Sequence, residues 1–249
     1  MKLALVTGGT RRLGAAIAAR LAADGYTLAL HAHDHPEPEG VEGRVFTADL
    51  ENADEARGLI PRVAEAFGVP PSLLVNSAAL FADDSFGRID PELAVRHYRI
   101  NALAPALLIE GMMRAGAAAG GEGDRSVVNI LDQRIAHPHG DQLGYTLSKC
   151  ALAGLTQAAA RALAPGLRVN AVAPGLTLPT DDYVPGQMER LAGLMPLDRL
   201  PKPEEVAEAV AYLAGASATT GQVIHVDGGA GGVAFLRDFA ALARDSDPA

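Results

Sequence analysis

The sequence predicts an α/β protein with a parallel sheet that is covered by helices on both faces. Seven short apolar runs alternate along the chain with segments rich in alanine, leucine and glutamate. Alternation of strand and helix favours a parallel sheet between two helical layers. The chain has 249 residues, of which 49% are hydrophobic, so it can fill one large core and we expect a single domain over 1–249.

The first unit reads as strand, turn and helix. KLALV at 2–6 is a short apolar run, TGGTRRLG at 7–14 is a glycine turn, and AAIAARLAADG at 15–25 is a helix-forming segment that ends at a glycine. The first backbone N–H groups of such a helix face an anion. Ligands of parallel α/β sheets bind beyond the carboxyl ends of the strands, so the informative residues should follow each apolar run.

The other strands are expected at 27–33, 44–50, 72–78, 126–132, 167–175 and 221–229, with helices that include 52–68 and 151–165. The connection at 34–43 contains two prolines and is too short for a good helix, so we expect an irregular crossover. A short C-terminal tail, about 231–249, is expected to begin as an amphipathic helix near Phe235 and to end polar.

Composition and charge disfavour several classes of partner. The 21 Lys and Arg against 30 Asp and Glu give a net charge of −9, which disfavours nucleic acid and anionic membranes. Cys150 is the only cysteine, so no intrachain disulfide is possible; we interpret it as a small buried residue in a reducing compartment. No apolar stretch reaches about 20 residues. We expect a cytoplasmic protein that binds small molecules.

A candidate catalytic pair lies in YTLSK at 145–149. Tyr145 and Lys149 are four residues apart and share one face of the predicted helix. A tyrosine has a pKa of about 10 and is a poor acid–base catalyst at neutral pH. A nearby cation stabilises the phenolate and lowers the pKa of the phenol toward neutrality. Such a pair also arises by chance on a solvated helix face, so further motifs are needed to support a catalytic role.

Seven motifs occur in one order: TGGTRRLG at 7–14, ADL at 48–50, VNSAA at 75–79, Asn101, YTLSK at 145–149, NAVAPG at 170–175 and TGQVIHVDGG at 220–229. In this set, over about residues 2–229, the chain resembles the short-chain dehydrogenase/reductase family. The resemblance implies a Rossmann-like, doubly wound parallel sheet of seven strands in three α/β/α layers. It also implies a nicotinamide cofactor and a homotetramer or homodimer that packs the helices around 97–119 and 144–164.

The resemblance assigns roles to individual residues. It implies that Tyr145 is the proton donor in hydride transfer, that Lys149 holds the nicotinamide ribose, and that Asn101 organises a water-linked proton path. Asp49 and Leu50 are expected to flank the adenine. The full set of cofactor contacts expected is Gly8, Thr10, Arg11, Arg12, Leu13, His33, Asp49, Leu50, Asn76, Ser77, Ala78, Lys149, Pro174, Gly175 and Thr177.

Two departures from the common family pattern point to a subgroup. Arg12 stands where most members have glycine, and Asp132 stands where most have the catalytic serine, thirteen residues before Tyr145. Together they resemble the pteridine reductases and the similar dihydromonapterin reductases. Phe81 falls where pteridine reductases carry the phenylalanine that stacks on the pterin, and Thr177 in PGLT resembles the hydroxyl of their PGLS.

These substitutions make physical sense for a pterin, which is a flat heteroaromatic ring with polar groups along its rim. Phe81 offers an aromatic face, and Arg12 can donate both to a cofactor phosphate and to the pterin carbonyl. Asp132 can accept from ring N–H groups and from Tyr145. A carboxylate there would repel the oxyanion that develops when a ketone is reduced. We therefore predict Arg12, Phe81, Asp132 and Tyr145 as substrate contacts and hydride addition at a C=N bond.

Several alternatives stay open. A carbonyl or alcohol oxidoreductase that carries Asp132 is the main one, and a cofactor-binding regulator without turnover is another. Arg12 could point to solvent, Asp132 could cap a loop, and Phe81 could be simple packing. The acids at 83–84 are interpreted as solvated loop charges. His31, His33 and His35 alternate in sequence, but with no cysteine nearby we expect no metal.

The cofactor is expected to be NADP(H). NAD-specific relatives generally hold the adenosine ribose with an acid at the end of the second strand, where this chain has Ala32. Arg11 matches the basic residue that contacts the 2′-phosphate in many NADP-using members. Asp34, Glu37 and Glu39 follow closely and argue the other way, so NAD(H) stays open.

Overall fold

The computed structural model contains one sheet of seven parallel strands in the order β3-β2-β1-β4-β5-β6-β7, which confirms the predicted doubly wound α/β fold. The structure describes residues 1–34, 37–118, 120, 124–179, 186–238 and 241. The strand order reverses between β1 and β4, and a ligand crevice is expected at such a reversal. The strands are β1 Leu3–Thr7, β2 Thr27–Ala32, β3 Arg44–Thr47, β4 Leu73–Asn76, β5 Ser126–Ile130, β6 Arg168–Pro174 and β7 Val223–Val226.

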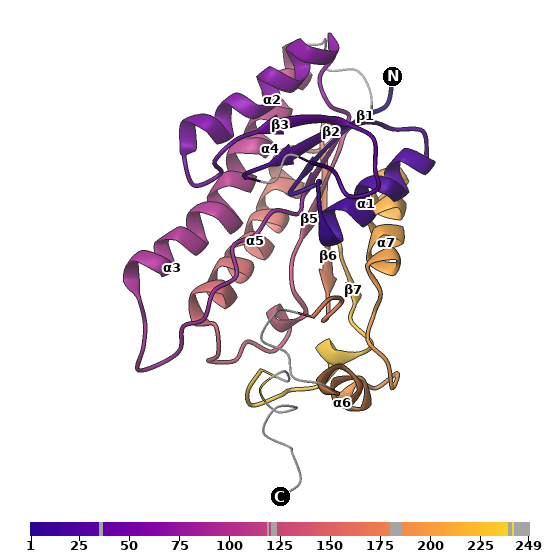
Figure 1. The fold of residues 1–249 in the computed structure, drawn as a ribbon. Helices are drawn as coiled ribbons and strands as arrows, with labels where there is room; N and C mark the ends of the chain where they lie inside the picture. Colours follow the sequence, from indigo (N-terminus) through magenta and orange to yellow (C-terminus); the bar gives the residue numbers. More distant parts are fainter. Residues whose placement is uncertain (35–36, 119, 121–123, 180–185, 239–240, 242–249) are drawn as a thin grey trace, which may run out of the picture.

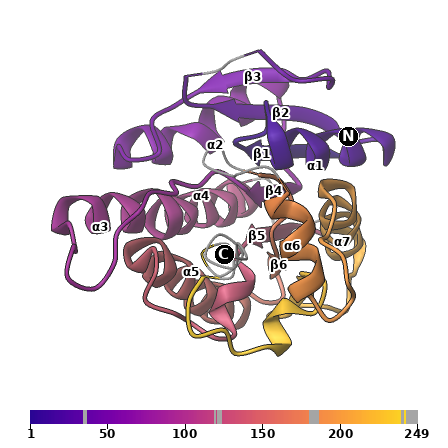
Figure 2. The same cartoon turned by 60° about the horizontal axis from the view of Figure 1, so that its bottom comes forward.

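Helices cover both faces of the sheet (Figures 1 and 2). Helices α1 and α7 pack against each other on one face, while α2, α3, α4 and α5 lie on the other. A shorter helix, α6, lies apart from both layers near β7 (Figure 1). The bounds are α1 Arg12–Ala23, α2 Ala53–Phe67, α3 Pro91–Tyr98, α4 Ala104–Ala118, α5 Leu143–Ala162, α6 Gln187–Leu194 and α7 Pro203–Gly215.

The central strand β1 shows why the sheet needs two helical layers. All five of its residues are buried. Leu3 and Leu5 join the core that α2, α4 and α5 cover, while Ala4 and Val6 join the core beneath α1 and α7. Successive side chains of a strand point to opposite faces, so a strand that is apolar throughout is stable only between two apolar layers.

Local chemistry sets the ends of the elements. Asn52 caps α2 by accepting hydrogen bonds from the backbone N–H groups of Asp54 and Glu55, at 3.0 and 3.4 Å. The helix ends at Gly68, whose φ of +72° is left-handed. The described part of the 34–43 crossover contains neither helix nor strand, as predicted.

The helix expected around 97–119 is interrupted. A π-helical turn, Arg99–Leu103, separates α3 from α4, and Asn101 lies within it. Such turns occur often at functional sites. The tail shows no helix over 235–238, and most of its predicted helix lies outside the described residues. Among the helices that the structure describes, none is both long and apolar enough to cross a membrane.

Candidate active site

The glycine turn after β1 brings the start of α1 against the sheet. Gly8 has a φ of +61° and Arg12 a φ of +52°, so Arg12 takes the left-handed conformation that favours glycine. Gly14 lies directly on Gly8, since a Cβ at Gly14 would overlap the Gly8 carbonyl group. This close packing seats the first turn of α1 against the carboxyl end of β1, and the first backbone N–H groups of a helix have no partner within the helix.

A cavity of about 570 Å³ lies in front of this turn, where the sheet order reverses. It brings together ten of the predicted cofactor contacts. His31, Asp34, Glu51 and Arg96 also line it. The ten predicted residues are Gly8, Thr10, Arg11, Arg12, Leu13, His33, Asp49, Leu50, Ser77 and Ala78. The cavity, the glycine turn and the cations at 11 and 12 fit the phosphates of a dinucleotide.

The His31 side chain joins the glycine turn to the segment that follows β3. Its Nδ1 lies 3.2 Å from the backbone nitrogen of Gly8 and its Nε2 lies 3.0 Å from the carbonyl oxygen of Ala48. The Gly8 N–H donates to Nδ1, so the proton of the neutral ring is on Nε2, which donates to Ala48. Burial lowers the pKa of His31. His33, by contrast, is exposed, with its Nδ1 3.9 Å from a carboxylate oxygen of Asp49.

The loop after β4 is held by Thr7. The Thr7 hydroxyl accepts hydrogen bonds from the backbone N–H groups of Ser77 and Ala78, at 2.9 and 3.0 Å. Asn76 is buried beneath them, and its amide nitrogen donates to Oδ1 of Asn129 at 2.8 Å. Its own Oδ1 is buried without a hydrogen-bond partner among the described residues. The Asn76 side chain therefore joins β4 to β5, and it is not among the residues that line the cavity.

The predicted catalytic group comes together between the end of β5 and the start of α5. The Tyr145 hydroxyl donates to Oδ2 of Asp132 at 3.1 Å. The other oxygen, Oδ1, accepts from the backbone N–H of Arg134 at 2.9 Å and from its Nε at 3.2 Å. Asp132 therefore both caps a turn and contacts the phenol.

Lys149 and Asn101 complete the group. Lys149 is buried, and its Nζ donates to the carbonyl oxygen of Ile130 at 2.8 Å. The Asn101 amide donates to the Leu80 carbonyl oxygen and to the Ser148 hydroxyl, each at 2.9 Å, and its Oδ1 accepts from the Leu80 N–H at 2.7 Å. Asn101 thus joins the loop after β4 to α5.

The electrostatics differ from the sequence-based expectation in one respect. Lys149 was expected to lower the pKa of Tyr145. In the structure burial, followed by the charge of Asp132, raises that pKa well above its usual range, and the charge of Arg134 opposes the shift. Burial also lowers the pKa of Lys149 to about 8. At neutral pH the phenol therefore keeps its proton and Lys149 is mostly charged.

Of the remaining predicted contacts, Phe81 touches this group, and the others lie at the glycine turn and after β6. The Phe81 ring meets the Tyr145 ring edge-on, with centroids 4.8 Å apart, and is 50% exposed. The exposed guanidinium of Arg12 donates to the carbonyl oxygen of Pro179 at 3.0 Å, so it reaches the segment that follows β6. Pro174 ends β6 and Gly175 follows it, where a Cβ would lie 2.8 Å from the Asp227 Cα. Thr177 follows, half-buried.

Three residues were missed or misread from the sequence. Arg134 is 5% exposed and its guanidinium carbon lies 4.9 Å from the centroid of the Tyr145 ring. Asp84 was expected to be solvated but is buried, and it accepts from the Gly144 N–H at 3.0 Å. Glu39 accepts from the Arg12 N–H at 3.0 Å, at the start of α1. For Arg134 the sequence offered a cue, because an acid two residues earlier often forms a side-chain turn.

No group of three or more His, Cys, Asp or Glu side chains that could hold a metal ion occurs among the described residues. His35 lies outside them.

Comparison with known proteins places this geometry in a family. Residues 8–231 match the family described as enoyl-(acyl carrier protein) reductase. A (3R)-3-hydroxyacyl-CoA dehydrogenase from Canis lupus familiaris is 32% identical, over 91% of this chain and 95% of that protein. The 3-oxoacyl-[acyl-carrier-protein] reductase FabG of Staphylococcus aureus is also 32% identical, over 92% and 97%.

A solved structure is similar over the same extent. FolM alternative dihydrofolate reductase 1 from Brucella suis, in complex with NADP, superposes with a TM-score of 0.84 and is 38% identical, over 93% of this chain and 96% of that one. The order of motifs, the seven-stranded sheet and these relatives agree, and the chain belongs to the short-chain dehydrogenase/reductase family of NAD(P)-dependent oxidoreductases.

Proposed function

We propose that the protein is an NADPH-dependent reductase of dihydropterins or dihydrofolate-type substrates. The observation that carries the proposal is the hydrogen bond from the Tyr145 hydroxyl to Asp132, at 3.1 Å, where the common family pattern has a serine. A carboxylate at this point disfavours the developing oxyanion of a ketone. It suits a ring with N–H groups, which donate to it. The FolM relative, which is a dihydrofolate reductase by name, supports this choice.

The proposed reaction adds hydride to a ring carbon and a proton to the adjacent nitrogen of a C=N bond. Bound NADPH supplies the hydride. Tyr145 supplies the proton, because its raised pKa keeps the phenol protonated at neutral pH. Asp132 orients the phenol and accepts from the pterin, the exposed Phe81 ring offers a face to it, and Lys149 holds the nicotinamide ribose.

Arg12 is assigned to both cofactor and substrate. Its backbone N–H lies at the glycine turn and its guanidinium reaches Pro179, beyond β6. A side chain that spans these two points can donate to a phosphate on one side and to a pterin carbonyl on the other.

NADP(H) is the proposed cofactor. Ala32 ends β2 where NAD-specific relatives place an acid, and Arg11 and His33 line the cavity nearby. The NADP of the FolM relative agrees with this assignment. Asp34 and Glu51 also line the cavity, and a comparison of initial rates with NADPH and NADH tests the choice. A clear preference for NADH would refute it.

Reduction of a 3-oxoacyl thioester is the second candidate. The FabG and hydroxyacyl-CoA relatives favour it by name. One substitution distinguishes the two candidate functions. Asp132→Ser would restore the common family pattern, so it should raise the rate of reduction of a ketone and lower the rate of reduction of a pterin.

The deciding experiment follows NADPH consumption with 7,8-dihydrobiopterin, dihydromonapterin, dihydrofolate, an acetoacetyl thioester and a panel of ketones. Tyr145→Phe serves as the blank, and its loss of the proton donor should lower kcat by at least about 100-fold. Turnover of the thioester or the ketones alone would overturn the pterin assignment.

The proposal extends to assembly and location. A dimer or tetramer packed on the long helices is supported by exposed apolar side chains on them, Tyr98 of α3, Met113 of α4 and Leu147 of α5. Sedimentation velocity tests this, and a monomer at micromolar concentration would contradict it. The single half-buried Cys150 suits the reducing cytoplasm.

A further inference from the structure

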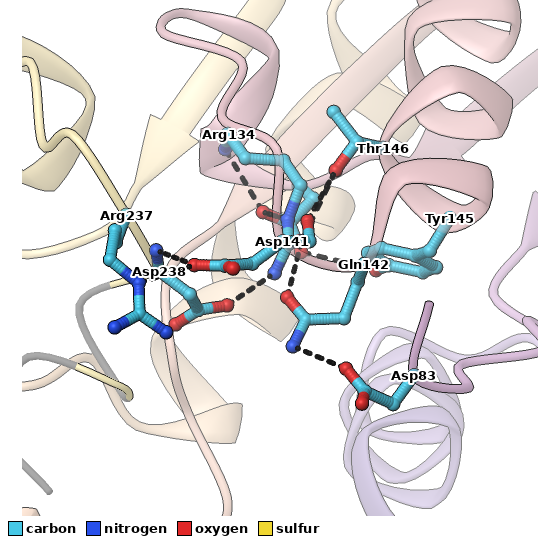
Figure 3. Close-up of polar contacts among 9 residues, drawn as sticks. Asp83, Arg134, Asp141, Gln142, Tyr145, Thr146, Arg237 and Asp238 are labelled. Atoms are coloured by element: carbon cyan, nitrogen blue, oxygen red, sulfur yellow. Dashed lines mark hydrogen bonds and ion pairs between the residues drawn. The ribbon is translucent and has the colours of Figure 1, made fainter. Parts of the chain in front are cut away.

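Arg134 is the centre of a buried charge cluster beside the Tyr145 side chain (Figure 3). Its side chain is 6% exposed and contacts two carboxylates that are far apart in the sequence. Its Nε lies 3.2 Å from Oδ1 of Asp132, and its Nη2 lies 3.1 Å from Oδ2 of Asp238. Gln142 and Thr146 accept from Nη1 at 3.2 and 3.3 Å. A buried guanidinium with this many partners is held in one place.

The position of Arg134 fixes the direction of Asp132. Oδ1 of Asp132 is occupied by the backbone N–H and Nε of Arg134, so that Oδ2 is left for the hydroxyl of Tyr145. A carboxylate that is gripped through one oxygen cannot turn without losing these charge-assisted bonds. The hydrogen bond to the phenol therefore depends on where the guanidinium lies.

Asp238 is brought to Arg134 by the segment near the C-terminus. It is 6% exposed, and its backbone N–H donates to Oδ2 of Asp141 at 2.8 Å. Arg237 adds an ion pair to the same carboxylate, with its Nε at 3.5 Å. The segment is thus attached both to the loop before α5 and to the buried guanidinium.

We propose that Asp238 is a positioning residue for the reduction: it holds Arg134 so that Asp132 stays aimed at Tyr145. The inference rests on the proposed function, which takes Tyr145 as the proton donor. Without the carboxylate of Asp238, Arg134 keeps one of its two ion pairs. The guanidinium then interacts more strongly with Asp132. Because one negative charge is lost from the cluster, the electrostatic potential at the phenol becomes more positive.

The charged and titratable groups that face the phenol are Asp132 and Arg134 after β5, Lys149 on α5, His97 on α3 and Asp238. The loop before α5 adds His139 and Asp141 beside the pair of Arg134 and Asp238, and burial lowers the pKa of His139. The negative charge of Asp238 adds to the forces that raise the pKa of Tyr145. Removal of this charge therefore lowers that pKa, and the alkaline limit of activity moves to lower pH, because reduction needs the protonated phenol.

The test compares Asp238→Asn with Asp238→Glu and a matched control, Asp83→Asn. Asn keeps the shape without the charge, while Glu keeps the charge. Asp83 is an exposed carboxylate that reaches Gln142 but not the guanidinium. We expect Asp238→Asn to lower kcat/KM about 10-fold and to move the alkaline limb to lower pH. Asp238→Glu should restore the limb, and Asp83→Asn should leave both unchanged.

A second readout needs no substrate. NMR titration of ¹³C-labelled tyrosine, with Tyr145→Phe to assign the resonance, should show the pKa of the phenol falling in Asp238→Asn and recovering in Asp238→Glu. This holds even if the wild type reduces no pterin, so failure of the proposed function and failure of this inference are distinguishable. Thermal unfolding of each variant shows whether a change in activity comes from loss of the fold or from a local change around the phenol. An unmoved phenol pKa in folded Asp238→Asn would overturn the proposal.

Discussion

Arg12 combines an unfavourable backbone conformation with a useful side chain. Its φ of +52° is the left-handed region, which costs a residue other than glycine about 1–2 kcal/mol. Glycine is the common residue here in the family pattern, and the arginine therefore persists against a conformational preference. Residues in such conformations cluster at functional sites.

Substitution of this residue should separate stability from activity. Arg12→Gly relieves the backbone, so the free energy of unfolding should stay within about 1 kcal/mol of the wild type or rise. The loss of charged hydrogen bonds should lower kcat/KM for a dihydropterin about 10- to 100-fold. Urea denaturation and steady-state kinetics measure the two effects. Equal kcat/KM in the variant would contradict the assignment of Arg12 to the substrate.

Glu39 places a negative charge where cofactor phosphates are expected. Its carboxylate accepts from the Arg12 N–H at the start of α1, and its own N–H donates to the Thr10 carbonyl oxygen at 2.7 Å. A carboxylate at a helix N-terminus is favourable in itself. It also competes with any other anion for the same N–H groups.

Neutralisation of Glu39 should therefore tighten cofactor binding. Glu39→Gln is expected to lower the Kd for NADPH about 5-fold at low salt, which corresponds to about 1 kcal/mol. The gain should shrink at high ionic strength. Calorimetric titration measures it, with Glu37→Gln as the control, an exposed carboxylate two residues earlier. A weaker complex with Glu39→Gln would mean that Glu39 assists binding.

At the scale of elements, the contact between β1 and α1 depends on two glycines. A Cβ at Gly14 would overlap the carbonyl group of Gly8, whereas a Cβ at Gly58 in α2 would meet nothing within 4 Å. Gly14 and Gly58 both lie within helices. A comparison of alanine at these two positions therefore separates the effect of packing from the effect of helix propensity.

Alanine at these two positions should have opposite effects. Gly14→Ala should push α1 away from the sheet, lower the melting temperature and abolish NADPH binding. Gly58→Ala should raise the free energy of unfolding by about 0.5–1 kcal/mol, because glycine is a poor helix former. Calorimetry and NADPH fluorescence report the two properties. A Gly14→Ala protein that binds NADPH normally would contradict the role of this close contact.

The limits of prediction from sequence are visible in single elements. The strands were predictable because parallel strands buried on both faces must be apolar, as in β1. Tyr145 and Lys149 could be paired because four residues of one helix set their spacing. Asp84 could not be placed, since it looks like a loop charge but meets Gly144, sixty positions later. The contact between Arg134 and Asp238 spans 104 positions and follows from the folded chain alone.

For the molecule as a whole, His31 links stability to pH. It is neutral in the fold, where it joins β2 to the glycine turn and to the segment after β3, and its pKa is lowered by burial. The unfolded chain therefore binds a proton that the folded chain does not. Stability from this group is full above the unfolded pKa of about 6.5 and is lost as pH falls toward the folded pKa.

The free energy of unfolding should accordingly decrease below pH 6.5, with a contribution from His31 of up to about 1.4 kcal/mol per pH unit. His31→Gln should flatten this slope, whereas His33→Gln, which changes a side chain that is 63% exposed, should not. Urea titrations between pH 5 and 8 provide the comparison. An identical slope in His31→Gln and the wild type would refute the linkage.

Among the residues that the structure describes, all that line the cavity in front of the glycine turn precede position 101, whereas Asp132, Tyr145 and Lys149 follow position 130. The residues of the nucleotide cavity therefore come before the reacting groups in the sequence, and Asn101 lies between the two sets. A hybrid that joins one homologue up to the π-helical turn with another beyond it should therefore take its coenzyme preference from the first parent. Its substrate range should depend on both parents, because Arg12 and Phe81 come from the first, whereas Asp132 and Tyr145 come from the second. Recombination within a single gene can thus change the proton-donating group while the reductant stays the same.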